Sequence, residues 1–341
     1  MGNLTLAWRN ARKGKSRKKD VVEFERNLEK NLLALHTELT SKTYMPRPLV
    51  AFVVRDPKTR KIAKSDIRDR IVHHALINII GPIFERMFIY DSCANRKGKG
   101  TLFALWRFYY YLRKVTLNRT REAYCLKADV KKYFENVNHL TLINIIRKKI
   151  ADENTLELIQ KINANFGMKR ERERECVTSW LEPKGMPLGN LTSQFFANVY
   201  LNELDYFVKH VLKIECYIRY VDDFVILHES REQLEKWKSE INYFLQNKLK
   251  LTLHPQKSRI ASLSSGVDFV GFRNFYYHCL LRKRSLRKMM RKIEMFHRGE
   301  KDFGSLMDNY QGWQAHAQWA HTRKTREKIR KLIAGALLER I

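Results

Sequence analysis

The sequence predicts an α+β protein with an antiparallel sheet at its centre. Residues 123–130 form a short apolar strand, and residues 216–228 have the pattern of a β-hairpin. Segments with the apolar spacing of amphipathic helices lie between and after these strands. This order of strand, helices, hairpin and helix favours the α+β class. The sequence has neither repeats nor a low-complexity linker, so we expect its parts to interlock in one multi-lobed body.

The other elements follow from the same signals. Residues 48–65 are expected to form a hairpin with its turn at 57–59. The charged run at 168–185 alternates in sign, which favours a solvated hairpin over a helix. Helical periodicity is found at residues 21–40, 66–88, 138–150, 154–166, 193–212 and 231–248.

Composition limits the class of partner. The 341 residues include 66 Lys and Arg against 36 Asp and Glu, a net charge of +30. Such an excess predicts a polyanionic partner, either nucleic acid or a membrane surface. No apolar run approaches the roughly 18–20 residues of a spanning helix, so we expect no membrane association. The five cysteines are scattered and never form CxxC, which favours free thiols in a reducing cytoplasm over a zinc site or disulfides.

Basic residues gather in three places. Residues 1–19 carry seven Lys and Arg without an acid, and 281–298 and 321–332 combine basic residues with helical apolar spacing. Each cluster alone could be a solvated helix face. Three clusters in one strongly basic chain favour contact with a nucleic-acid backbone.

Three carboxylates carry the clearest chemical signal. Asp222 and Asp223 lie side by side where the hairpin reverses, and Asp129 ends the strand at 123–130. An Asp-rich turn would explain the pair alone. Together, the three side chains would repel one another unless divalent cations were bound. Mg²⁺ prefers such oxygen ligands, with Mn²⁺ as a possible substitute, and two ions support in-line phosphoryl transfer.

These residues also resemble a known family. The pattern AD-xxxx-F at 128–134 and YVDD at 220–223 resembles the palm of a reverse transcriptase. The resemblance implies a right-hand polymerase fold of fingers, antiparallel-sheet palm and short helical thumb. Further segments resemble the family's motifs in the same order along the chain, at residues 60–76, 88–105, 185–205, 253–258 and 267–272.

The resemblance also divides the chain. We expect a basic helical extension, fingers with part of the palm, a first palm segment, an insertion of helices and a hairpin, a second palm segment and a basic thumb. The predicted ranges, in that order, are 1–43, 44–122, 123–135, 136–184, 185–279 and 280–341.

The family implies catalytic roles for particular residues. Asp129, Asp222 and Asp223 would bind two metal ions, and the backbone carbonyl of Val130 would add a ligand. Phe134 falls at the position of the steric gate, where a bulky ring excludes a ribose 2′-hydroxyl. A core aromatic is the alternative for Phe134.

Basic residues at family positions would contact phosphate. Arg60 matches the residue that grips the incoming triphosphate, and Lys58 would assist it. Lys257 fits the lysine that protonates pyrophosphate, although a solvated lysine is the alternative. Arg96 and Lys97 would touch backbone phosphate, with a surface loop as the alternative.

The remaining predicted site residues rest on the resemblance as a group. Leu188, Gly189 and Gln194 occupy nucleotide-binding positions. The nucleic-acid contacts would come from Tyr220, Val221, Gly271, Arg282 and Lys283.

One loop departs from most of the family. Where Q-G-x-x-x-S-P is common, this chain has Leu188 before Gly189 and Gln194 after Ser193. This pairing is similar to the reverse transcriptases of diversity-generating retroelements, which copy a template RNA with frequent errors at adenines. Since Leu188 cannot supply the hydrogen bonds of a glutamine, we expect weaker discrimination between right and wrong bases. A group II intron, retron or defence enzyme, or a non-catalytic RNA-binding palm protein, is the alternative.

The subfamily resemblance implies partners as well. They are a template RNA, a primer that is extended into cDNA, deoxynucleoside triphosphates and a small basic accessory protein that assembles as a pentameric barrel. The expected setting is the cytoplasm of a bacterial or phage-infected cell.

Overall fold

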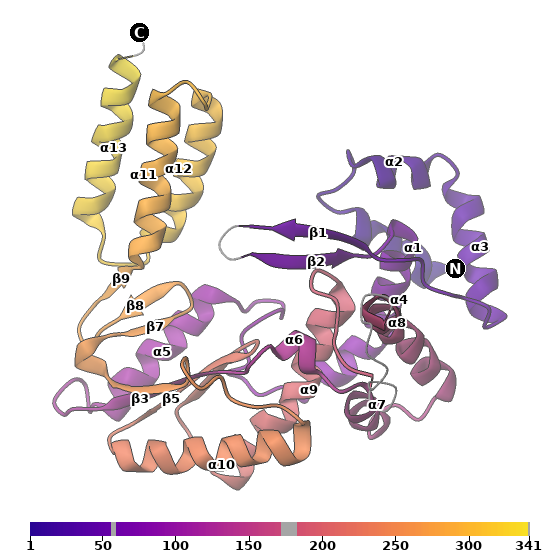
Figure 1. The fold of residues 1–341 in the computed structure, drawn as a ribbon, viewed down its shortest axis with the longest axis horizontal. Helices are drawn as coiled ribbons and strands as arrows, with labels where there is room; N and C mark the ends of the chain where they lie inside the picture. Colours follow the sequence, from indigo (N-terminus) through magenta and orange to yellow (C-terminus); the bar gives the residue numbers. More distant parts are fainter. Residues whose placement is uncertain (56–58, 172–182, 340–341) are drawn as a thin grey trace.

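A four-stranded antiparallel sheet lies at the centre of the fold, with strand order β4-β5-β3-β6 (Figure 1). The computed structural model describes residues 1–55, 59–171 and 183–339. The sheet corresponds to the predicted palm, and the α+β class is confirmed. Its strands are β3 (Tyr124–Asp129), β4 (Tyr217–Tyr220), β5 (Asp223–His228) and β6 (Arg259–Ser262).

The two faces of this sheet enter different cores because side chains alternate along each strand. Leu126 and Ile226 belong to the larger core, together with residues of α9 (Leu191–Tyr206) and α10 (Arg231–Leu249). On the opposite face, the core includes Cys125 and residues of α5 (Thr101–Val115). Helices therefore cover the sheet on both sides.

Helices and one hairpin form a second lobe, called the fingers below (Figure 1). It combines elements from the ranges predicted as N-terminal extension (1–43), fingers (44–122) and insertion (136–184), whereas α5, also within 44–122, lies against the palm sheet. The hairpin pairs β1 with β2 in antiparallel register and projects toward the C-terminal helices. The elements are α1 (Gly2–Arg12), α2 (Lys19–Glu25), α3 (Leu28–Thr40), β1 (Val50–Val54), β2 (Arg60–Lys64), α4 (Ile67–Glu85), α7 (His139–Arg147) and α8 (Glu153–Glu171).

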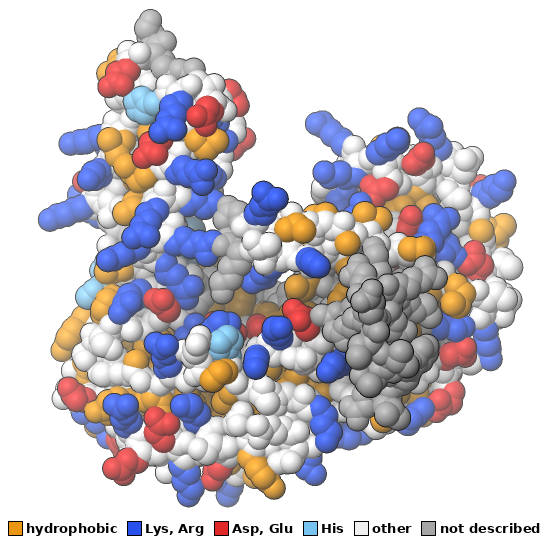
Figure 2. All heavy atoms as spheres, in the orientation of Figure 1, with side chains coloured by type: hydrophobic (Ala, Val, Ile, Leu, Met, Phe, Trp, Pro, Cys, Tyr) orange, Lys and Arg blue, Asp and Glu red, His pale blue; other side chains and the backbone are white. Residues whose placement is uncertain are grey.

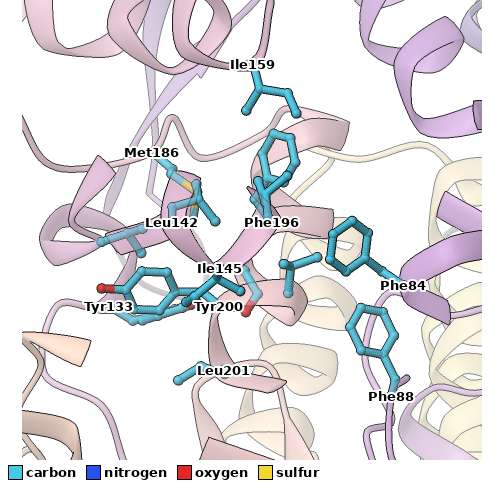
Figure 3. Close-up of a cluster of buried hydrophobic side chains, with 14 of the residues drawn as sticks. Phe84, Phe88, Tyr133, Leu142, Ile145, Ile159, Met186, Phe196, Tyr200 and Leu201 are labelled. Atoms are coloured by element: carbon cyan, nitrogen blue, oxygen red, sulfur yellow. Dashed lines mark hydrogen bonds between the residues drawn. The ribbon is translucent and has the colours of Figure 1, made fainter. Parts of the chain in front are cut away.

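A shared core joins this lobe to the palm. Figure 3 shows side chains from α4, α7, α8 and α9 directed toward one another, with Tyr133 of the short helix α6 (Tyr133–Asn136) among them. Tyr133 is fully buried and its hydroxyl donates to the Ala197 carbonyl at 2.7 Å. Since each group contributes to the same interior, the fingers and palm stabilise one another.

Three helices form a separate C-terminal lobe that corresponds to the predicted thumb (Figure 1). It has its own core, which includes Ile293, Trp313 and Ile329. A small three-stranded sheet precedes the lobe in the chain. The palm region also contains one π-helical turn and one 3₁₀-helical turn. These elements are η1 (Phe207–Val211), η2 (Leu263–Ser265), β7 (Val267–Phe269), β8 (Phe272–Asn274), β9 (Cys279–Leu281), α11 (Lys283–His297), α12 (Phe303–Ala317) and α13 (Arg323–Leu338).

The structure corrects two predicted helix boundaries. The helix expected at 21–40 is broken at Arg26 and Asn27, and Asn31 Nδ2 donates to the Phe24 carbonyl across the break at 2.8 Å. The helix expected at 193–212 leaves α-geometry after Tyr206 and ends in a π-turn. The charged run at 168–185 begins as the end of α8, and its central residues 172–182 lie outside the described part of the chain.

Two predictions from composition can be compared with the described residues. Cys93, Cys125, Cys216 and Cys279 are buried free thiols. Among the helices of the described ranges, none has the length and apolar character needed to span a membrane.

Candidate active site

The three predicted carboxylates meet at one end of the central sheet. Asp129, the last residue of β3, is the direct partner of Asp223, the first residue of β5. Asp222 lies in the turn between β4 and β5, and its carbonyl accepts a hydrogen bond from Val130 N at 3.2 Å. The antiparallel register thus brings Asp129 together with residues 93 and 94 positions later in the sequence.

The turn that carries Asp222 has an unfavourable backbone conformation. Val221 has φ +59°, in the left-handed region that β-branched residues rarely adopt. Among the residues described, Val270 (φ +42°), in the β7–β8 turn, is the other β-branched residue with a positive φ. Strain of this kind persists where surrounding contacts enforce it, and it is common at functional sites.

A fully buried arginine holds the strained turn in place. Arg219 Nη1 donates to the Val221 carbonyl at 3.0 Å and to Asn198 Oδ1 at 3.1 Å. Its Nε and Nη2 form a bidentate pair with Asp205, at 2.7 and 2.6 Å. Nη2 also donates to Ser92 Oγ at 3.0 Å. All five guanidinium N–H groups therefore have acceptors, as the burial of a charge requires.

The same arginine ties the turn to the segment before α5. Its backbone N donates to the Asp91 carbonyl at 3.0 Å, and its carbonyl accepts from Cys93 N at 2.9 Å. The Asp91 carboxylate binds Arg107 and accepts from the Tyr111 hydroxyl at 2.6 Å. A continuous polar network thus runs from the carboxylate turn to α5.

Burial and mutual repulsion disfavour ionisation of the paired aspartates. The pKa of Asp222 is raised to about 6, chiefly by burial and then by the charge of Asp129. Burial also raises the pKa of Asp223, although Lys127 opposes the shift. Nearby lysines neutralise part of the charge: Lys257 Nζ lies 2.5 Å from Asp129 Oδ2, and Lys127 Nζ lies 3.3 Å from Asp223 Oδ2.

The donor set fits hard divalent cations. It is made of carboxylate oxygens, and Asp223 Oδ1 is buried without a hydrogen-bond partner. In the described ranges, no group of three acidic, His or Cys side chains is arranged to hold a metal ion. The carboxylates repel one another, and two of them are instead paired with Lys127 and Lys257.

A cavity of about 750 Å³ opens beside the carboxylates. In the space-filling view the molecule is hollowed between the thumb and the fingers, with Lys and Arg side chains around the opening (Figure 2). Arg60 of β2 lines the cavity, and its charge acts on Asp222 to lower the pKa. The other lining residues are Thr101, Leu102, Tyr220, Asp223, Val270, Gly271, Arg282, Ala315, His316 and Trp319.

Comparison with known proteins identifies the family. Residues 55–274, more than half of the chain, match the family described as "Reverse transcriptase (RNA-dependent DNA polymerase)". The chain belongs to the reverse transcriptase family. Reverse transcriptases synthesise DNA on an RNA template from a primer and deoxynucleoside triphosphates, and they generally use a divalent metal.

Curated relatives include intron-encoded proteins. The chain is 26% identical to Protein YkfC of Escherichia coli over 300 residues, which covers 77% of this chain and 74% of YkfC. It is 24% identical to the group II intron-encoded protein LtrA of Lactococcus lactis over 313 residues, covering 72% of this chain. The chain spans about half of LtrA, 49% of its length. A solved structure of apo telomerase from Candida tropicalis, truncated from its C-terminal domain, is similar with 13% identity and a TM-score of 0.47, covering 74% of this chain and 60% of that one.

The loop before α9 of this reverse transcriptase rests on the fingers hairpin. The Leu188 carbonyl accepts from Ala63 N of β2 at 3.1 Å. Gly189 has φ +109°, and a Cβ there would lie 2.8 Å from Ile62 Cγ2, so only glycine fits. Gln194 is exposed on the first turn of α9.

Of the other predicted site residues, Arg282 lines the cavity, whereas Phe134 and Lys283 do not. Phe134 is half-buried against the larger core, and its carbonyl accepts from Met186 N at 2.7 Å. Arg282 lines the cavity and lowers the pKa of Asp223 by its charge. Lys283 is exposed at the start of α11. Lys58 lies outside the described residues.

Arg96, in the segment NRKGKG at residues 95–100, turns toward the protein interior. Arg96 is 8% exposed, and its Nε pairs with Glu85 at 2.6 Å. Its Nη1 donates to the Ile89 and Ser92 carbonyls at 2.7 and 3.0 Å. These contacts occupy Arg96 within the protein, whereas Lys97 is exposed and better placed for a phosphate.

Sequence reasoning missed the residues that support the turn. Apolar periodicity predicts only that Asn198 and Asp205 belong to a helix and that Arg219 belongs to the hairpin. One signal could have found the pair: Tyr217 and Arg219 alternate onto the same buried face of β4, and a charged residue there needs a buried partner. Both residues bond to Asp205.

Proposed function

We propose that Asp129, Asp222 and Asp223 hold two divalent cations for RNA-templated DNA synthesis in the adjoining cavity. The observation that carries this proposal is their register: Asp129 is opposite Asp223, with Asp222 in the adjoining turn, in a chain of the reverse transcriptase family. When bound, Mg²⁺ would activate the primer's 3′-oxygen and stabilise the departing pyrophosphate.

The chain's own residues supply the remaining contacts. Arg60 binds the incoming triphosphate because its guanidinium lines the cavity near Asp222. Lys257, whose Nζ lies beside Asp129, would hold the proton that the pyrophosphate takes up. Tyr220, at the end of β4, and Gly271, in the β7–β8 turn, both line the cavity and position the primer end.

Primer extension on an RNA template with Mg²⁺ tests the activity. The wild type should incorporate deoxynucleotides, and Asp222→Ala should be slower by about a hundredfold or more. Asp308→Ala, which changes an exposed carboxylate on α12, should match the wild type. Absence of incorporation by the folded wild type would leave a non-catalytic RNA-binding protein as the better explanation.

We further propose that the enzyme copies its template with low fidelity, as in a diversity-generating retroelement. Leu188 supports this proposal because its loop is hydrogen-bonded to β2, the strand that begins with Arg60. An aliphatic side chain cannot hydrogen-bond to the nucleotide, so a right base gains less over a wrong one. Each lost hydrogen bond is worth about 0.5–1.5 kcal/mol, or several-fold in selectivity.

Sequencing of cDNA from Leu188→Gln tests this step. We expect several-fold fewer errors at template adenines than in the wild type, with Leu188→Met as the apolar control. An unchanged error spectrum in Leu188→Gln would remove the role of Leu188. Faithful copying by the wild type would remove the proposal of low fidelity altogether.

A group II intron-type enzyme is the second candidate, favoured by the similarity to LtrA. A diversity-generating retroelement would place a gene for a small basic accessory protein and paired template and variable repeats beside this gene. An intron enzyme would instead be encoded within a folded intron RNA. Inspection of the genomic neighbourhood separates the two.

A further inference from the structure

Helix α5 has an exposed apolar stripe that the polymerase site does not use. Leu102, Trp106 and Tyr110 follow one another at four-residue spacing and therefore lie on one face of the helix. They are 40%, 56% and 48% exposed, although the opposite face of α5 is buried against the palm sheet. Large side chains exposed in a row commonly mark a binding surface.

The rings along this stripe form a connected row. The ring centroids of Tyr90 and Phe103 are 5.3 Å apart, and those of Phe103 and Trp106 are 5.9 Å apart. Trp106 and Tyr110 follow at 6.4 Å. Because each ring contacts the next, the row is ordered before any partner binds.

Two cations lie over rings of this row. The Arg107 guanidinium lies 5.1 Å from the centroid of Tyr90, 5.6 Å from Trp106 and 4.7 Å from Tyr110. Arg107 is itself fixed by its ion pair with Asp91. Lys99 Nζ lies 4.0 Å from the Tyr90 centroid. Such cation–π contacts stabilise the ring positions.

The stripe continues into a hollow of about 610 Å³ at the C-terminal half of the helix. Trp106, Tyr110, Arg113 and Leu117 line this hollow. Arg113 is exposed and has no acidic partner among the residues that the structure describes. Exposed aromatic rings beside a free cation are the combination with which proteins bind unpaired nucleic-acid strands.

The position of the stripe connects it to the active site. Leu102 lines the catalytic cavity, and Thr101 Oγ1 lies 3.2 Å from the Tyr220 hydroxyl. From Leu102 to Tyr110 the helix rises about 12 Å, at 1.5 Å per residue. In Figure 1, α5 runs from the centre of the molecule toward its left side. The row of rings therefore begins at the cavity and leads away from it.

We propose that this face of α5 binds an unpaired nucleic-acid strand that extends from the primer–template duplex in the cavity. The proposal rests on the polymerase function above. Bases stack on Trp106 and Tyr110, and Arg113 contacts the backbone. Trp, Tyr and Arg are also common at protein interfaces, but the unpaired Arg113 and the net charge of +30 favour a polyanion.

Fluorescence anisotropy with three RNA–DNA duplexes tests the proposal without triphosphates. One duplex has a short template overhang, one has a long unpaired 5′ template overhang, and one has a long unpaired 5′ tail on the primer. The wild type should bind at least one long-tailed duplex more tightly than the short one, and the comparison identifies which strand follows α5. Trp106→Ala and Tyr110→Ala should each weaken that tailed duplex about fivefold or more and leave the short one unchanged.

Matched variants complete the test. Trp106→Phe keeps an aromatic surface and should retain most of the affinity. Tyr243→Ala removes a ring that is 71% exposed on α10, across the palm sheet from α5, and should bind every duplex as the wild type does. Equal binding of the tailed duplex by a double variant, Trp106→Ala with Tyr110→Ala, and by the wild type would overturn the proposal.

Two other results would also contradict it. One is an equal loss for short and tailed duplexes. The other is that the Trp106 and Tyr110 variants change the mass of the protein in light scattering but leave its affinity for every duplex unchanged. That result would assign the face to a protein partner. Because the assay needs no catalysis, it can succeed even if primer extension by the wild type fails, and the reverse also holds.

Discussion

The β4–β5 turn of the palm and the β1–β2 hairpin of the fingers bring opposite charges to one cavity, and they are held in different ways. The palm turn is supported from beneath by Arg219, whose side chain is fully buried. In the hairpin every side chain of β1 is exposed, and Arg60 at the start of β2 is exposed as well. The hairpin contacts the rest of the protein near its base. Ala63 N donates to the Leu188 carbonyl, and Lys64 Nζ lies 2.7 Å from Asp20 Oδ2.

The difference follows from the charges. Three neighbouring carboxylates repel one another, so the fold must enforce their positions at the cost of a strained Val221 and a buried ion pair. An arginine that grips a triphosphate is attracted to its ligand and needs less support. We therefore expect changes in the palm turn to affect stability and activity together, and changes in the hairpin to affect substrate binding alone.

The largest effect is expected for Arg219→Met. It leaves the buried Asp205 without its cation, and breaking such a pair costs about 3–5 kcal/mol in the free energy of unfolding, measured by urea denaturation. Polymerase activity should fall as well because the Val221 carbonyl loses its donor.

The double variant Arg219→Met with Asp205→Leu separates these two effects. Replacing both charges by apolar groups should restore much of the stability, since no unpaired charge remains buried. Activity should stay low because the turn still lacks its support. A single variant that loses less than about 1 kcal/mol would show that the network does not hold the turn.

A smaller and more selective effect is expected for Arg60→Ala. The KM for deoxynucleoside triphosphates should rise about tenfold or more, because a charge-assisted contact is worth about 1.5–3 kcal/mol. The free energy of unfolding should stay within about 0.5 kcal/mol of the wild type. Lys61→Ala is the matched control, since alternation directs this exposed neighbour to the opposite face of β2. Equal KM changes in both variants would mean that only general positive charge matters.

The smallest effect is expected in the pH dependence of stability without metal. The folded pKa of Asp222, about 6, lies above its ordinary value of 3.8, so the folded state binds more protons between these values. The contribution of Asp222 to stability therefore improves as pH falls from 7.5 to 5. Asp222→Asn should be more stable than the wild type at pH 7.5 with a chelator, and this advantage should shrink at pH 5. If the melting temperatures of Asp222→Asn and the wild type differed by the same amount at pH 7.5 and at pH 5, the raised pKa of Asp222 would be contradicted.

The sequence predicted the fold class and the carboxylate cluster well, for physical reasons. Apolar periodicity located α4 and α10, and register alone brought Asp129 opposite Asp223. It could not predict partners that depend on three-dimensional burial. Periodicity places Asp205 in a helix without showing its partner, and the family position of Arg96 predicts a phosphate contact. Only the folded chain shows that Asp205 pairs internally with Arg219, and Arg96 with Glu85.

The same limit applies to the aromatic stripe of α5. A helix with the sequence TLFALWRFYYYLRKV has apolar residues on most sides, so periodicity alone does not show which rings are buried. The structure buries Phe108 and Tyr111 and leaves Trp106 and Tyr110 exposed. The sequence pattern therefore could not predict a role for the buried rings or for the exposed rings.

Titration of Mn²⁺ into the protein, followed by calorimetry and electron paramagnetic resonance, tests the central claim most directly. The claim is that the supported palm turn makes the three carboxylates a two-metal site. We expect the wild type to bind two ions per chain, with loss of at least one in Asp222→Asn and full binding retained in Arg60→Ala. Equal stoichiometry and affinity in the wild type and Asp222→Asn would contradict the account.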